Sequence, residues 1–316
     1  MKLVILDWST MCRENDLSAE SFRQFGDVCC YPLTSPEETA ERIGDAEIVL
    51  CNKVKITREI MDSCPNLRYI GLFATGYNNV DVKYAAEKGI AVCNAGQYST
   101  KAVAQQVFAY ILDYANRVRD YDSAVKSGEW ETSPCFSYFP LPTMELEGKN
   151  LSIVGFGSIG RRVAELGSAF GMNVIVSTRT MPSDCGYEVT DLETAVKKAD
   201  FLTFHCPLTE KTKGMVNAEL LKLMKPSAVV INTSRGAVVN EADLCAALNG
   251  GQLARAYLDV LETEPMSPET PLKSAKSCVI TPHTAWAPFE TRTRLLHIVL
   301  DNIAAWLSGS PKNKVT

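Results

Sequence analysis

Residues 151–160 read LSIVGFGSIG, and this stretch decides the fold. A short apolar run is followed at once by glycines in the pattern G-x-G-x-x-G, and a helical pattern begins within it. The first glycine permits a tight turn, the second lets backbone N–H groups approach a pyrophosphate, and the third lets helix and strand pack closely. A helix N-terminus also carries partial positive charge, which suits phosphate groups. The turn predicts a dinucleotide site made by Gly155, Gly157, Ser158, Ile159 and Gly160.

Apolar strands alternate with helical patterns on both sides of this turn. Near-continuous apolar strands separated by helices are typical of parallel sheets that are covered on both faces. We therefore expect an α/β protein with two doubly wound parallel-sheet domains, the second with a six-stranded, dinucleotide-type sheet. The expected strands lie within 3–6, 27–31, 47–51, 67–72 and 90–94, and then within 151–156, 173–178, 200–206, 228–234, 254–260 and 278–283.

Longer helical patterns occupy the middle and the end of the chain. One helix is expected over 101–125 and another over 289–307. Between the first helix and the glycine-rich turn, residues 128–150 are rich in Pro, Gly and aromatic side chains and predict an extended surface segment. The length of 316 residues, at roughly 150 residues per domain, is consistent with two domains.

The composition excludes several classes of protein. Apolar residues make up 46% and charged residues 22%, as in ordinary globular proteins, which argues against a disordered or fibrous chain. The formal net charge of −5 argues against a nucleic-acid partner and against a polybasic membrane anchor. No apolar run approaches the length of a membrane span, and the N-terminal apolar run is too short for a signal peptide.

The eleven cysteines are an odd number, so at least one stays unpaired. None is spaced as C-x-x-C, and the spacing typical of zinc sites is absent, so no metal site is expected. Buried thiols that act as small apolar side chains are the simplest interpretation, and they imply a reducing compartment. We expect a soluble, cytoplasmic protein.

The end of the strand after the glycine-rich turn bears on the choice of cofactor. An acidic residue there, roughly 20 residues past the turn, would accept a hydrogen bond from the ribose 2′-hydroxyl of NAD. This chain instead has Thr178 and Arg179, and hydroxyl and guanidinium groups suit a 2′-phosphate. The sequence therefore favours NADP(H) over NAD(H). The alternative is that Arg179 stacks on adenine or points into solvent, which leaves NAD usable.

Reactive side chains follow the later strands, at the edge where parallel sheets bind ligands. Of the three histidines, His205 and His283 end strands, so one or both could face the cofactor. Cys206 and Pro207 continue from His205 as a loop shaped around the cofactor. His283 has the better case for acid–base work, because imidazole titrates near neutral pH.

Two further charged residues complete this group. Arg235 follows another strand and could bind a carboxylate through both guanidinium nitrogens, while Glu264 follows the next strand along the chain. Together with His283, they point to hydride transfer to a carbonyl acid.

At this point the chain resembles the D-isomer-specific 2-hydroxyacid dehydrogenase family over almost its whole length. The NTSRG segment, the E-x-E-P segment and the P-H segment occur in the family's order, which makes the likeness specific. The matching stretches are VGFGSIGRRVA, HCPLTEKTKGMVN, LLKLMKPSAVVINTSRGAVVNEADL, LDVLETEP and ITPHTAW. Thr178 departs from the acidic residue that is usual in the family at that position.

The resemblance implies a role for each matching residue. Arg235 would bind the substrate carboxylate and carbonyl, Glu264 would orient His283, and His283 would donate the proton in the reducing direction. Backbone amides of the loop LFATGYNNVD would meet the substrate carboxylate, which places Ala74, Thr75 and Gly76 there. The remaining expected cofactor contacts are Thr212, Thr233, Ser234, Asp259 and Trp286.

The same resemblance indicates substrate and architecture. The stretches AGQYSTKAVAQQVFAYIL and VKSGEW, together with Trp286, are similar to the hydroxypyruvate and glyoxylate reductase (glycerate dehydrogenase) branch. The alternatives are a D-lactate-type or other 2-hydroxyacid dehydrogenase, and a non-enzymatic NAD(H)-sensing protein of the corepressor type.

The family's architecture implies a discontinuous flavodoxin-like substrate domain over 1–98 plus 287–316 and a Rossmann NAD(P)-binding domain over 99–286. It also implies a homodimer formed through the cofactor domain. The expected dimer surface lies in residues 101–150 and includes Tyr110, Trp130, Phe136 and Tyr138.

Overall fold

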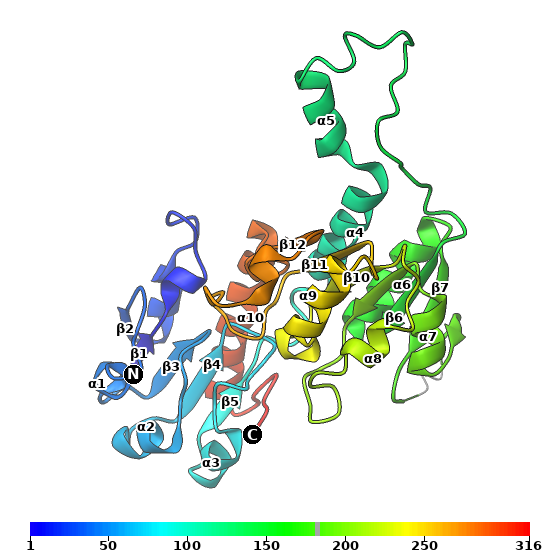
Figure 1. Cartoon of the computed structure of the whole chain (residues 1–316). Helices are drawn as coiled ribbons and strands as arrows, with labels where there is room; N and C mark the ends of the chain where they lie inside the picture. Colours follow the sequence, from blue (N-terminus) through cyan, green and yellow to red (C-terminus); the bar gives the residue numbers. More distant parts are fainter. Residues whose placement is uncertain (181–183) are drawn as a thin grey trace. The chain divides into compact units, whose positions relative to one another are not determined.

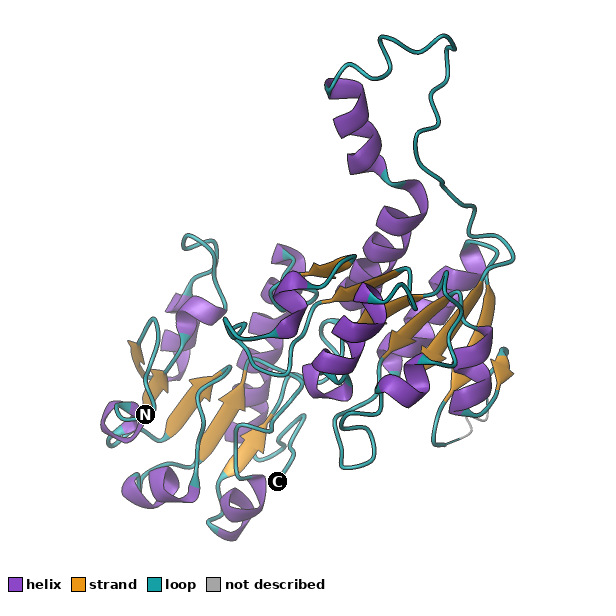
Figure 2. Ribbon diagram, viewed as in Figure 1, coloured by secondary structure: helices purple, strands orange, loops and turns teal. Residues whose placement is uncertain are grey.

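Two compact units make up the protein, whose computed structural model describes residues 1–180 and 184–316. Unit 1 consists of Met1–Ser99 together with Ala287–Thr316, and unit 2 consists of Thr100–Trp286. Each unit has a parallel sheet with helices around it (Figures 1 and 2). This confirms the predicted α/β class with two parallel-sheet domains.

Unit 1 has a five-stranded parallel sheet in the order β2-β1-β3-β4-β5, which is the flavodoxin-like order. Its central strands are fully buried because they contain no charged or strongly polar residue and face helices on both sides. The strands are β1 (Lys2–Ile5), β2 (Asp27–Cys30), β3 (Ile48–Cys51), β4 (Tyr69–Leu72) and β5 (Ala91–Cys93). The helices are η1 (Trp8–Thr10), η2 (Ala19–Phe25), α1 (Thr39–Ile43), α2 (Arg58–Ser63), α3 (Val82–Glu87) and α10 (Phe289–Leu307).

The last helix, α10, belongs to unit 1 although it follows all of unit 2 in the chain. Leu295, Val299 and Ile303 lie on one face and are buried, whereas His297 lies on the exposed face. The ring of Trp306 lies 5.0 Å from the ring of Tyr69 on β4. The amphipathic pattern of 289–307 therefore gives a helix that packs on the unit 1 sheet.

Unit 2 has a seven-stranded parallel sheet in the order β12-β11-β10-β9-β6-β7-β8. Its strands are β6 (Asn150–Val154), β7 (Asn173–Ser177), β8 (Glu188–Val189), β9 (Phe201–Phe204), β10 (Val229–Asn232), β11 (Arg255–Leu258) and β12 (Cys278–Ile280). Its helices are α4 (Thr100–Asn116), α5 (Val118–Lys126), α6 (Ser158–Ala169), α7 (Leu192–Lys198), α8 (Ala218–Leu221), η3 (Gly236–Val238), α9 (Glu241–Asn249) and η4 (Pro271–Ser274).

The expected count of six strands in this sheet was wrong by one short edge strand. β8 has only two residues and pairs with β7 alone, through Ile175 with Glu188 and Val176 with Val189. Two residues without an apolar run carry no periodicity, so the sequence pattern could not indicate them.

The single helix expected over 101–125 was also wrong, because the structure contains two helices there. Arg117 lies between α4 and α5 in the left-handed region, with φ 52° and ψ 38°. α5 and the chain after it project away from the unit 2 sheet (Figure 1). Tyr110 is only 4% exposed, so its expected place on an outer surface was wrong too.

Among the described residues, no helix combines the length and the apolar character needed to cross a bilayer.

Candidate active site at the carboxyl edge of the unit 2 sheet

The strand order of unit 2 gathers the expected site residues along one edge of its sheet. His283 follows β12, Glu264 follows β11 and Arg235 follows β10, and these three strands are neighbours. β9 and β6 come next in the sheet, and they end at His205 and at the glycine-rich turn. From β6, the strands that follow in the chain are added on one side as β7 and β8 and on the other side as β9 to β12. Open α/β sheets bind ligands at the point where the strand order reverses in this way.

His283 and Glu264 form a direct pair. The Nδ1 atom of His283 lies 2.6 Å from Oε2 of Glu264, and both side chains are about one-third exposed or less, at 27% and 33%. Glu264 is itself oriented by the backbone N–H of Leu261, which donates to its Oε1 at 3.0 Å. An ionised carboxylate can only accept, so Nδ1 of His283 is the donor. This tautomer leaves Nε2 as the nitrogen that can exchange a proton with a substrate.

The loop that carries His283 is held by the buried carboxylate of Asp259, which is 1% exposed. This carboxylate accepts from Thr281 Oγ1 at 2.5 Å and from the two backbone N–H groups that follow His283, each at 2.9 Å. The hydroxyl of Thr281 must therefore donate to Asp259, so the Tyr110 hydroxyl, 2.5 Å away, donates to Thr281. Asp259, expected beside the cofactor, thus makes its described hydrogen bonds within the protein.

His283 itself has a left-handed backbone, with φ 55°. Its N–H donates to the carbonyl oxygen of Asp259 at 2.8 Å. A non-glycine residue in this region costs free energy, which the surrounding bonds must offset. The loop therefore presents the imidazole in one fixed direction.

Arg235 lies in a turn that is organised by the side chain of Asn232. The amide oxygen of Asn232 accepts from the N–H of Ser234 at 3.0 Å and from its hydroxyl at 2.8 Å, while the amide nitrogen donates to the Arg235 carbonyl at 2.9 Å. Arg235 is half-buried, and its Nη1 donates to the Ser234 carbonyl at 2.7 Å.

Gly236 allows this turn to lie directly on the loop that carries Glu264. A Cβ at Gly236 would lie 1.8 Å from the carbonyl carbon of Leu261, so no other residue fits without a shift. Only glycine permits so close an approach of two backbones.

The glycine-rich turn after β6 has the geometry that its spacing predicts. Gly155 has φ 95°, and a Cβ there would lie 2.7 Å from the backbone nitrogen of Cys206. A Cβ at Gly160 would lie 2.2 Å from the Gly155 carbonyl oxygen, whereas a Cβ at Gly157 would meet nothing within 4 Å. Gly157 also caps α6 without a side-chain hydrogen bond. This open, uncapped helix N-terminus can accommodate phosphate groups.

Two orphaned polar atoms lie at the same edge of the sheet. In the described part of the chain, the Nδ1 atom of His205 and the Oγ1 atom of Thr233 are buried without a hydrogen-bond partner. Such atoms are costly unless a ligand or water satisfies them. Together with the glycine cradle, they fit a bound dinucleotide.

Burial gives His205 a different chemistry from His283. It lowers the pKa of His205 from 6.5 to about 3, so this imidazole is neutral at pH 7. Its Nε2 lies 3.0 Å from the Thr203 hydroxyl. Of the two histidines expected at the cofactor edge, His205 is therefore suited to hydrogen bonding rather than to proton transfer.

The loop after His205 is closed by Thr212. Its hydroxyl donates to the Pro207 carbonyl at 2.7 Å and accepts from the Thr209 N–H at 2.8 Å. Burial raises the pKa of the Cys206 thiol, which keeps it protonated. The expected cofactor residues Cys206, Pro207 and Thr212 thus belong to one ordered loop, and Thr212 holds its shape.

At the end of β7, Thr178 is half-buried and Arg179 is exposed. The sequence reasoning overlooked Arg161, in the first turn of α6, whose guanidinium binds both carboxylate oxygens of Asp184 at 2.9 and 3.1 Å. The Arg161 guanidinium also lies 4.7 Å from the ring centre of Phe156 in the glycine-rich turn. Its position directly after the third glycine was visible in the sequence, but its partner was not.

The other expected residues lie elsewhere. Ala74, Thr75 and Gly76 follow β4 in unit 1, where Asn94 Nδ2 donates to the Thr75 carbonyl at 2.8 Å and Thr75 Oγ1 donates to the Gly96 carbonyl at 2.5 Å. These bonds hold the loop at the carboxyl edge of the unit 1 sheet. Trp286, the last residue of unit 2, is half-buried.

Comparison with known proteins identifies the family. Residues 108–285 match the model of the D-isomer specific 2-hydroxyacid dehydrogenase, NAD binding domain. The chain belongs to the D-2-hydroxyacid dehydrogenase family. As such, it is an NAD(P)-dependent oxidoreductase that acts on CH–OH donors and reduces 2-oxo acids.

Individual relatives of this dehydrogenase cover nearly its whole length. It is 40% identical to a hydroxypyruvate reductase of Blautia hydrogenotrophica over 323 aligned positions, covering 100% of this chain and 99% of the relative. The crystal structure of a protein from Thermus thermophilus has a TM-score of 0.89 and 32% identity, with 100% of both chains covered. That of an NADPH-dependent glyoxylate/hydroxypyruvate reductase from Sinorhizobium meliloti, in complex with NADP and malonate, has a TM-score of 0.85 and 29% identity, covering 100% of this chain and 96% of that one.

Proposed function

We propose that this dehydrogenase reduces hydroxypyruvate and glyoxylate with NADPH, giving D-glycerate from hydroxypyruvate. The observation that carries the proposal is the His283–Glu264 pair beside the Arg235 turn, on the sheet edge that also holds the glycine cradle. The names of the hydroxypyruvate and glyoxylate/hydroxypyruvate reductases among its relatives support this substrate class.

In the proposed mechanism, a bound reduced nicotinamide would supply the hydride that C2 of the 2-oxo acid accepts. Arg235 binds the anionic substrate and polarises its carbonyl group. His283 donates a proton from Nε2 to the carbonyl oxygen, and Glu264 keeps the ring oriented through its bond to Nδ1. Proton donation by a positioned residue is worth about 10²- to 10⁴-fold in rate.

We further propose that residues 1–98 with 287–316 bind the substrate and that residues 99–286 bind the cofactor. Backbone amides at Ala74, Thr75 and Gly76 would meet the substrate carboxylate. The residues proposed to hold the cofactor are Gly155, Gly157, Ser158, Ile159, Gly160, Thr178, Arg179, His205, Cys206, Pro207, Thr212, Thr233, Ser234, Asp259 and Trp286.

The preference for NADPH over NADH rests on the end of β7. Thr178 offers a hydroxyl and the exposed Arg179 offers a guanidinium, and neither would repel a 2′-phosphate as a carboxylate would. Arg179→Ala should raise KM for NADPH about 10-fold or more and leave KM for NADH little changed, because only NADPH carries the phosphate. Equal use of NADPH and NADH by the wild type would contradict the preference.

Initial rates across a panel of 2-oxo acids test the substrate. We expect hydroxypyruvate and glyoxylate to be reduced with higher kcat/KM than pyruvate or bulkier 2-oxo acids. Arg235→Ala and His283→Ala should each lower kcat/KM by at least about 10²-fold while the Kd for NADPH is unchanged. Rates no higher with either acid than without substrate would refute the proposal.

We also propose that the enzyme is a homodimer formed through α5 and the segment after it. This segment exposes large apolar side chains, including Phe136 at 92% and Phe139 at 84%. Monomeric proteins seldom leave such side chains together in water. The cytoplasm is the proposed compartment, supported by cysteines whose free thiols suit reducing conditions.

A further inference from the structure

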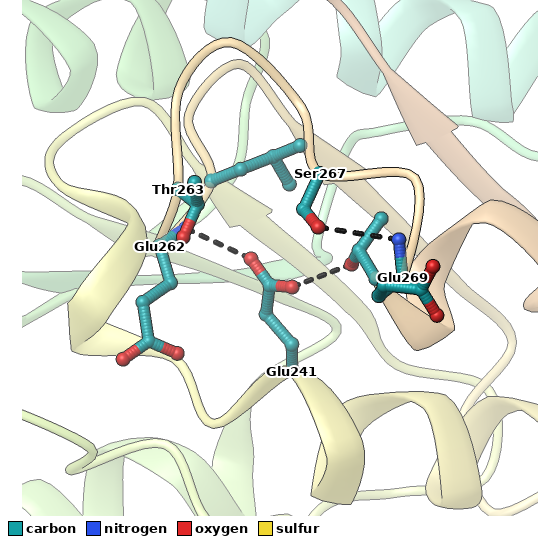
Figure 3. Close-up of a pocket in the computed structure, with 7 residues that line it drawn as sticks. Glu241, Glu262, Thr263, Ser267 and Glu269 are labelled. Carbon is teal, nitrogen blue, oxygen red and sulfur yellow. Dashed lines mark hydrogen bonds between the residues drawn. The ribbon is translucent and has the colours of Figure 1, made fainter.

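We propose that Glu241 is a positioning residue for the reaction, because its carboxylate holds the loop that carries Glu264. This inference rests on the proposed function, in which Glu264 orients His283. Glu241 begins α9 and is half-buried. Figure 3 shows it between the two ends of the loop, in a pocket lined by residues 241, 261–263, 267, 269 and 270.

Both carboxylate oxygens of Glu241 accept hydrogen bonds from this loop. Oε1 accepts from the backbone N–H of Glu262 at 2.8 Å, and Oε2 accepts from the Thr270 hydroxyl at 2.6 Å (Figure 3). Glu262 and Thr270 lie on opposite sides of Glu264 in the chain. One carboxylate therefore bridges the two ends of the segment that presents Glu264.

The contact with Glu262 continues directly to the His283 pair. The residue before Glu262 is Leu261, whose N–H orients the Glu264 carboxylate at 3.0 Å. That carboxylate lies 2.6 Å from His283 Nδ1. The peptide between Leu261 and Glu262 also rests on Gly236, next to Arg235. Glu241 thus holds the peptide that is shared by the Glu264 loop and the Arg235 turn.

The other carboxylates that line this pocket provide controls. Within the described residues, the side chains of Glu262 and Glu269 accept no hydrogen bond, and both residues are exposed. Hydrogen bonds to a charged group are stronger than neutral ones. In metal sites, removing a residue that orients a ligand costs about 10- to 100-fold in affinity or activity, and this sets the scale expected for Glu241. Glu269→Ala removes the same charge from the pocket without removing any described side-chain hydrogen bond of the loop.

The test compares Glu241→Ala, Glu241→Gln and Glu269→Ala. Glutamine can accept from the Glu262 N–H and donate to the Thr270 hydroxyl, so Glu241→Gln should keep kcat/KM within about threefold of the wild type. Glu241→Ala should lower kcat/KM about 10- to 100-fold, mainly in kcat, with the Kd for NADPH unchanged.

A measurement without substrate separates this inference from the proposed function. With only three histidines, NMR of labelled imidazoles can follow His283 directly, assigned through His205 and His297 variants. The resonance of the His283 Nδ1 proton, which is hydrogen-bonded to Glu264, should move upfield or be lost by exchange in Glu241→Ala and stay unchanged in Glu241→Gln and Glu269→Ala, whichever substrate the enzyme uses. Failure of the substrate panel with this NMR result intact would remove only the proposed substrate.

A second pair of variants covers the case in which Glu241→Ala unfolds the loop. Thr270→Val removes one of the two bonds and Thr270→Ser keeps it. Thr270→Val alone should therefore shift the His283 Nδ1 proton resonance and lower kcat, by less than Glu241→Ala. The inference is overturned if Glu241→Ala matches Glu269→Ala in both readouts, or if Glu241→Gln loses as much activity as Glu241→Ala.

Discussion

Two histidines at the same edge of the unit 2 sheet differ in their chemistry because their surroundings differ. The His283 ring donates from Nδ1 to a carboxylate and keeps Nε2 for a substrate, whereas the His205 ring is buried with one nitrogen unpartnered among the described residues. The sequence placed both at strand ends and favoured His283 for acid–base work. The difference arises because His205 is buried and His283 is paired with Glu264. Both conditions depend on residues that lie far away in the chain.

The low pKa of His205 predicts a pH-dependent stability. The unfolded chain binds a proton on this residue below about pH 6.5, whereas the folded chain does so only near pH 3. Folding therefore loses stability as the pH falls from 6.5 towards 3. His205→Asn should lessen this loss by roughly 1–2 kcal/mol between pH 7 and pH 5, measured by urea unfolding at both pH values.

The exposed His297 on α10 provides the control for this experiment. His297→Asn should unfold with the same pH dependence as the wild type. An unchanged pH dependence in His205→Asn would mean that its ring is hydrated in the folded protein.

Among the elements, the break between α4 and α5 is the clearest departure from the local pattern. The helical periodicity over 101–125 continues through Arg117, and no proline or glycine marks an end there. The structure nevertheless turns the chain at Arg117 into the left-handed region, and the Arg117 Nε atom donates to Asp120 at 2.8 Å. The packing of α4 in unit 2 and the outward course of α5 therefore outweigh the local preference for one continuous helix over 101–125.

Glycine and alanine at position 117 test this break. Both substitutions remove the ion pair with Asp120, but only glycine adopts the left-handed region without strain. Arg117→Gly should therefore be more stable than Arg117→Ala by about 1 kcal/mol in thermal or urea unfolding. If Arg117→Ala is the more stable variant, residues 101–125 form one continuous helix in solution.

At the scale of the whole molecule, the exposed aromatic residues after α5 decide the expected assembly. Phe136→Asp combined with Phe139→Asp should convert a dimer into a monomer, because two buried charges in an apolar interface are costly. Sedimentation velocity at micromolar concentration measures the change. Leu33→Asp, at a position that is 63% exposed in unit 1, should leave the assembly unchanged.

If Leu33→Asp produces a monomer and the Phe136→Asp, Phe139→Asp variant remains a dimer, the interface lies in unit 1 and not after α5. A wild type that sediments as a monomer over the whole concentration range would refute the homodimer itself.

The sequence by itself determined the α/β class, the glycine-rich turn and the residues that follow each strand. These depend on local properties: apolar runs form buried strands, and the glycines at 155 and 160 permit the turn after β6. The same local information predicted α10 over its observed range, Phe289–Leu307.

Only the tertiary structure decided how these residues meet. The pairing of His283 with Glu264, the Asp259 contacts under the His283 loop and the bridge made by Glu241 join segments that are separated by 19 to 29 positions in the chain. Such contacts follow from strand order and from the paths of loops between strands, which apolar periodicity does not encode. The sequence of this dehydrogenase therefore shows the individual candidate residues, and the strand order of the sheet brings them together at one edge.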